Sequence, residues 1–75
     1  MDEQLQAFSE HLAHLTTAPA GVWRHVALPV AVAINALNAA AGIDAPRAEA
    51  TDAPVLLARQ FDAALRRRRT LATAS

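Results

Sequence analysis

The chain has 75 residues, with seven basic and seven acidic side chains and no cysteine. This length allows one domain at most, and a single small core gives that domain only a thin margin of stability. The absence of cysteine excludes disulfides and thiolate metal ligands, so we expect oligomerisation or docking on a larger partner to supply the missing reinforcement. The 20 alanines favour helix, and arginine without any lysine is a bias typical of a GC-rich bacterial genome.

The first predicted helix spans about residues 2–16. Asp2 can cap its start, where a negative charge also suits the helix dipole. Apolar side chains recur at intervals of three and four residues and form one narrow stripe that can pack against another helix: Leu5, Phe8, Leu12 and Leu15. The following TTAPAG segment is typical of a turn, in which Thr17 could cap a short turn beginning near Pro19.

The most informative segment lies between Arg24 and Asp44, where no side chain is fully charged. It predicts a second helix over about residues 22–41. Pro29 lacks an amide hydrogen and disfavours helix at the residue before it, so we expect either a helix start or a break and kink near this position. Gly42 fits the glycine position that commonly ends a helix.

The remaining pattern predicts a linker over 42–51, a third helix over about 52–71 and a frayed tail over 72–75. Thr51 or Asp52 can begin the third helix, with Pro54 in its first turn, where proline is tolerated. One face of this helix is expected to carry its apolar side chains: Leu57, Phe61, Ala64, Leu65, Leu71 and Ala72.

These elements predict an all-α fold, a small three-helix bundle with the second helix central and the other two packed on it. The central helix is apolar on nearly every side, which is more surface than two narrow stripes can cover. We therefore expect oligomerisation to complete the bundle, most simply as a homodimer. The predicted contacts with a copy or another protein are Trp23, Val30, Ala33, Ile34, Asn35, Leu37 and Asn38.

Three of these residues have alternative interpretations. Trp23 is either an interface anchor, because tryptophan is enriched among binding hot spots, or a lid on the end of the bundle. Asn35 and Asn38 lie one turn apart, and a buried pair could fix the register and the oligomeric state. Both asparagines could equally face water at the edge of the bundle.

A run of four consecutive arginines in the third helix supports a different function. Its members, which are the predicted charge contacts, are Arg66, Arg67, Arg68 and Arg69. They spread around the whole circumference of a helix and could contact phosphates, so a nucleic-acid-binding regulator is one alternative. The zero net charge and the lack of a recognition-helix pattern argue against it.

The spacing of charges next to this run also predicts local ion pairs. Asp62 lies three residues after Arg59 and four residues before Arg66. Side chains at these separations are neighbours on a helix surface, so we expect Asp62 to pair with both arginines.

Membrane association is the second alternative, because the 18 residues of 26–43 fall within the range of about 17–25 that can span a bilayer. Its many alanines, its two asparagines and its proline favour a packing helix instead. Metal binding by His11, His14 and His25 is not expected, because cysteine is absent and two solvated histidines beside the apolar stripe of the first helix are the simpler interpretation.

No constellation of nucleophile, base and phosphate loop is present in the sequence, so we expect no catalytic activity and no cofactor. The leading hypothesis is a small, non-catalytic bacterial protein of the cytoplasm that binds another protein through apolar helical surfaces. Adaptor, docking, accessory, regulatory and inhibitor roles all remain open.

Overall fold

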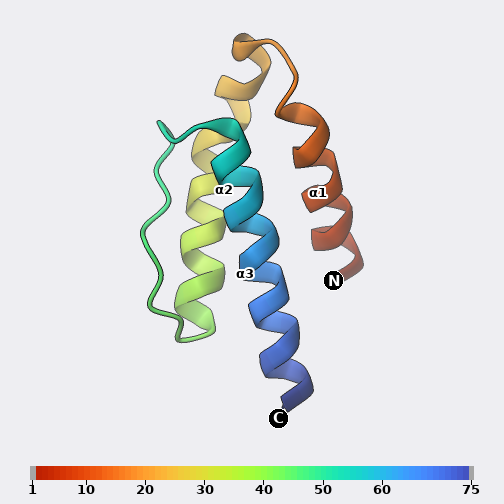
Figure 1. Ribbon diagram of the computed structural model, residues 1–75, viewed down its shortest axis with the longest axis vertical. Helices are drawn as coiled ribbons and strands as arrows, with labels where there is room; N and C mark the ends of the chain where they lie inside the picture. The colour runs from red at the N-terminus through yellow and green to blue at the C-terminus, as the bar shows by residue number, and fades with distance from the viewer. Residues whose placement is uncertain (1, 75) are drawn as a thin grey trace.

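The computed structural model describes residues 2–74 and the side chains of residues 3–73 (Figure 1). Within this range the chain forms three helices and no strand: α1 (Asp2–Leu15), α2 (Ala20–Ala40) and α3 (Pro54–Ala74). The predicted all-α three-helix bundle is thus confirmed. The capping role expected of the Asp2 side chain lies outside the described side chains.

The central helix is α3, not α2 as the sequence pattern suggested. α3 packs against both other helices, whereas α1 and α2 touch only weakly. Figure 1 shows α3 between the other two helices, with the connection 43–53 running back along α2. α3 contributes two large and fully buried side chains, Leu57 and Phe61, to the core cluster that joins all three helices.

The core is small and continuous across all three helices. Phe8 of α1 meets Phe61 of α3 edge to face, with ring centroids 5.4 Å apart and ring planes at 74°, an arrangement that the ring quadrupoles favour. The stripe of α1 packs inward as expected, with Leu12 fully buried. The remaining buried apolar side chains of this cluster are Trp23, Ala27, Val30, Ala31, Ile34, Ala48, Leu57 and Leu65.

α2 begins at Ala20 and continues through Pro29, so the expected start or break at the proline is wrong. Proline in a helix interior frees the carbonyl four residues earlier, here that of His25. Both residues are exposed, so water can bond the freed carbonyl and the helix is able to continue. Thr17 does not cap α2; its hydroxyl donates to the carbonyl of His14, at 2.9 Å, and Pro19 precedes the helix without a side-chain cap.

Gly42 ends α2 as predicted. Its φ of +69° lies in the left-handed region, where glycine avoids the steric cost of a side chain. The amides of Gly42 and Ile43 donate back to the carbonyls of Ala39 and Asn38, at 3.1 and 2.9 Å. These two bonds are those of a Schellman motif, so two carbonyls of the last helical turn are hydrogen-bonded by the backbone that follows it.

α3 begins at Pro54, two residues later than expected. Asp52 lies in the turn before the helix. Its carboxylate accepts a hydrogen bond from the amide of Glu49, at 2.9 Å, and so stabilises that turn instead of beginning the helix. The helix continues to Ala74, beyond the end predicted near residue 71, and Ser75 of the predicted tail lies outside the described residues. Leu71 and Ala72 are exposed rather than part of the buried face.

Candidate interaction surfaces

An uncovered apolar surface lies on α2, on the side facing away from the core, and it includes the two most exposed large apolar side chains of the described residues, Leu28 and Val32. At about 100° per residue, its members fall within an arc of about 80°. We define the outer face of α2 by these exposed residues: Leu28, Val32, Ala36 and Ala39. Leu28 and Val32 are 62% and 58% exposed, and none of the four side chains is charged.

Charged side chains border the outer face at both ends, and the connection 43–53 places exposed Arg47 and Glu49 along one flank, where Asn35 binds Ala48. Arg24 and His25 are exposed in the second turn of α2, and Asp44 is exposed just after the helix ends. Val22 and Pro29 extend the apolar surface along one flank, where Val22 is 45% exposed. The result is an apolar strip with a positive end and a negative end.

Most residues predicted for an interface lie on the opposite side of α2. Trp23, Val30, Ile34 and Asn38 are buried within the chain's own fold, which removes them from any surface that a partner could reach. Ala33, Asn35 and Leu37 are half-buried at the edges of that inward side. Trp23, Val30, Ile34 and Asn38 thus belong to the core, and the exposed apolar side chains of α2 lie on its other side.

Leu28 and Val32 fall outside the set of residues that the sequence pattern predicts for an interface. A helical periodicity test would have separated the two sides, because Val30 and Ile34 repeat on one side and Leu28 and Val32 on the other. The missing information was which of two apolar sides faces the core. The side with the larger buried set includes Trp23, the bulkiest residue of α2.

Asn35 has an internal role. Its amide nitrogen donates to the carbonyl of Ala48 at 3.0 Å, and its amide oxygen accepts from the Ala48 amide at 2.8 Å. Both polar groups of a nearly fully buried backbone position are thereby satisfied. The asparagine therefore fixes the connection 43–53 against α2, and neither predicted role, intermolecular register or simple solvation, describes it.

Asn38 is buried as well, and its side-chain oxygen accepts a hydrogen bond from the Arg67 guanidinium at 3.3 Å. Its backbone carbonyl meanwhile accepts from Ile43 in the turn that ends α2. Asn38 thus links the end of α2 to the middle of α3. A small cavity of about 60 Å³ lies beside this contact and is lined in part by Gln60 and Arg67.

The arginine run Arg66–Arg69 begins with an ion pair on the surface of α3. The guanidinium of Arg66 lies 3.0 Å from the carboxylate of Asp62, as the spacing of four residues predicts. The second predicted pair, between Asp62 and Arg59, does not occur in the part of the chain that the structure describes.

Two further arginines of the run make contacts within the chain, although Arg66, Arg67 and Arg69 are all exposed. Arg67 reaches Asn38 of α2, and Arg69 donates to the side chain of Gln6 on α1. Arg68 is half-buried, so it too presents only part of its surface to a phosphate. Consecutive positions point in different directions around α3, which is why successive arginines meet different surroundings.

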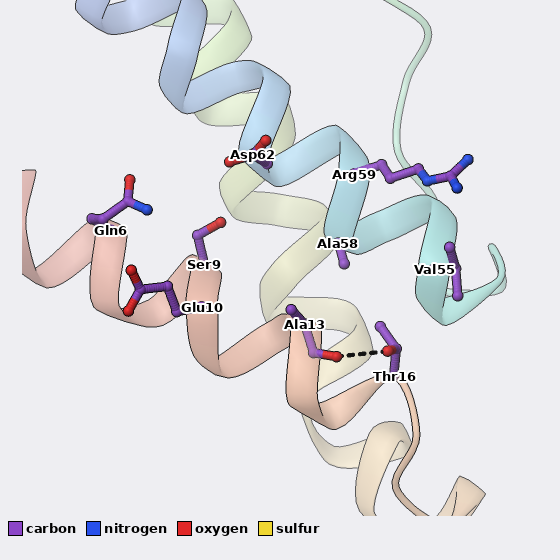
Figure 2. A pocket seen from close by; sticks show the side chains of 9 residues that line it. All are labelled: Gln6, Ser9, Glu10, Ala13, Thr16, Val55, Ala58, Arg59 and Asp62. Atoms are coloured by element: carbon purple, nitrogen blue, oxygen red, sulfur yellow. Dashed lines mark hydrogen bonds between the residues drawn. The ribbon is translucent and has the colours of Figure 1, made fainter.

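A second surface feature is the groove between α1 and α3 (Figure 2), which has a volume of about 360 Å³. Its lining includes apolar Ala13, Val55 and Ala58 and the buried, polar Ser9. Glu10 and Asp62 border it, while the Arg59 side chain points away from α1 (Figure 2). The groove mixes both charge signs and offers a weaker apolar surface than the outer face of α2.

Two further tests bear on alternative sites. Among the described residues, no group of three or more histidine, aspartate or glutamate side chains is arranged to hold a metal ion. By length and composition alone, Ala20–Ala40 could cross a membrane, although part of this helix is buried inside the fold. Core helices of soluble proteins meet the same criterion.

Comparison of the chain with protein-family models, curated proteins and solved structures finds no match. Its function must therefore be inferred from the surfaces of this molecule alone.

Proposed function

We propose that this chain is a small, non-catalytic interaction module that binds another protein through the outer face of α2. The observation that carries the proposal is the exposure of Leu28 and Val32 along a helix face without charge. Burying such side chains contributes roughly 1.5–3 kcal/mol each when they are fully covered. Contiguous apolar patches of this kind commonly mark binding sites on small proteins.

A protein partner is favoured over a membrane because the other side of α2 already packs in the core of the chain. Val30 and Ile34 are fully buried against the rest of the chain, and a spanning orientation would require α2 to leave that core. Asn35 and Asn38 would also lose their partners Ala48 and Arg67. Unpaired polar groups in hydrocarbon cost several kcal/mol each, so the membrane is the less favourable environment for this helix.

The contacts that the arginine run makes within the chain weaken the case for nucleic-acid binding that the sequence suggests. Arg66, Arg67 and Arg69 all contact side chains of the same chain, and Arg68 is half-buried, so phosphate binding would compete with the fold for these groups. The chain as a whole carries no net charge. It therefore offers little of the excess positive charge that usually attracts a nucleic acid.

Site-specific photo-crosslinking in the native host tests the proposal. A photoreactive residue at Leu28 is expected to give a covalent product with a protein, whereas one at Leu56, an exposed leucine of α3, is the matched control. A Leu28 product that disappears when Val32→Glu is added supports the outer face as the binding site. Equal labelling from both positions, or flotation of the purified chain with phosphatidylglycerol vesicles, would refute the proposal.

A further inference from the structure

We infer that the partner of the outer face is a second copy of this chain, paired antiparallel about Val32. This inference rests on the proposed function and adds the identity of the partner and the register of the contact. Three independent features of the described residues lead to it: the amount of exposed surface, the order of large and small side chains along α2, and the charges at its two ends.

The first feature is the surface area. The chain exposes 5103 Å² for a mass of 7.9 kDa, whereas a folded monomer of this mass exposes about 4,400 Å² by the usual scaling. The excess of about 700 Å² is close to the roughly 800 Å² that each partner buries in an interface of standard size. The surplus, summed over the whole elongated chain, is thus of the size that one dimer contact removes.

The second feature is the order of side-chain sizes. Leu28 and Ala36 lie four residues to either side of Val32, so an antiparallel pair centred on Val32 sets each Leu28 against Ala36 of the other copy. Large side chains opposite small ones allow two helices to approach closely and fill the space between them. A parallel pair would instead set Leu28 against Leu28 and Ala36 against Ala36, which leaves a gap at one end.

The third feature is the charge at the ends of the strip. Antiparallel pairing brings exposed Arg24 of one copy to the C-terminal end of the other α2, where helix carbonyls and exposed Asp44 are negative. Parallel pairing would bring Arg24 against Arg24 and Asp44 against Asp44. The same twofold arrangement repeats the favourable contact at both ends, as an isologous interface requires.

Single cysteines test the register directly, because the chain contains none of its own. Under mild oxidation Val32→Cys is expected to form a disulfide-linked dimer, since residues on a twofold axis meet their own copies within bridging distance. Leu28→Cys mixed with Ala36→Cys is expected to form a mixed dimer more readily than either variant alone. Val55→Cys is the matched control, a valine of similar exposure on α3.

Light scattering on the purified chain gives the second readout. The native chain and the Val55→Glu variant are both expected to have a solution mass twice that of one chain. The Val32→Glu variant is expected to have the mass of a single chain, with its helix content by circular dichroism unchanged. Arg24→Asp is expected to weaken the dimer, and Arg24→Asp combined with Asp44→Arg to restore it, because the exchanged charges still meet across an antiparallel interface.

A native chain of single-chain mass, or Val32→Cys that links no faster than Val55→Cys, overturns the second copy as partner. Self-linking of Leu28→Cys that outpaces the mixed pair overturns the antiparallel register. If the chain is monomeric while Leu28 still crosslinks to a larger protein in the host, the proposed function stands and this inference fails. If Leu28 gives no specific product and the chain is monomeric, both fail.

Discussion

The side chain of Asn35 forms hydrogen bonds with both the backbone amide and the backbone carbonyl of Ala48, which lies 13 positions later in the sequence. This one side chain satisfies both backbone groups of Ala48 in the connection 43–53, where Ala48 is only 2% exposed. The connection is therefore part of the packed structure and not a loose tether between α2 and α3.

Replacement of Asn35 by alanine is expected to lower the free energy of unfolding by about 2–3 kcal/mol, because the buried amide and carbonyl of Ala48 both lose their partner. Urea unfolding monitored by circular dichroism measures the change. Thr17→Ala is the control: it also removes a side-chain bond to a backbone carbonyl, but at an exposed position, and should cost less than about 0.5 kcal/mol. Equal effects of the two substitutions would contradict the role given to Asn35.

The two glycines should respond in opposite directions to the same substitution. Gly42→Ala is expected to destabilise the fold by about 1 kcal/mol, because a side chain is strained at positive φ. Gly21→Ala should stabilise it by about 0.5–1 kcal/mol, since this glycine is inside α2 and has no heavy atom within 4 Å of an added Cβ. Thermal unfolding of the two variants would show whether the signs differ.

Pro29→Ala is expected to stabilise the chain, by up to about 3 kcal/mol, because alanine restores the bond to the His25 carbonyl within α2. The exposed position of Pro29 means that no core packing is lost in exchange. Chemical denaturation at a fixed protein concentration measures the gain and separates it from any change in association. A loss of stability would indicate that the proline ring makes a contact of its own.

Neighbouring arginines should differ in their contribution to stability. Arg67→Ala is expected to cost about 1 kcal/mol, because it leaves the side-chain oxygen of buried Asn38 without its donor. Arg66→Ala removes only a surface ion pair with Asp62, which is worth about 0.2–0.5 kcal/mol. Comparing the two by urea unfolding tests whether the arginine run acts inside the fold, since a charge run that only faced solvent would give two small and equal effects.

Local features of the sequence were sufficient to predict the three helices, the end of α2 at Gly42 and the inward stripe of α1. What they could not supply was the choice between alternatives that differ only in tertiary contacts. Both sides of α2 are apolar, so the side facing the core depends on the shape of α3. The partner of Asn35 lies in an irregular segment whose path no periodicity describes. Pro29 is tolerated because its position is exposed, which the sequence around it does not reveal.

The position of α3 between its neighbours also sets the order in which the molecule can open. α1 is attached almost entirely through α3, whereas α2 is attached through both α3 and the Asn35–Ala48 bonds. Detachment of α1 therefore breaks fewer contacts than separation of α2 from α3, and it leaves the hairpin of the last two helices closed. We therefore expect amide hydrogens of α1 to exchange through this smaller opening, and faster than those of α2 and α3.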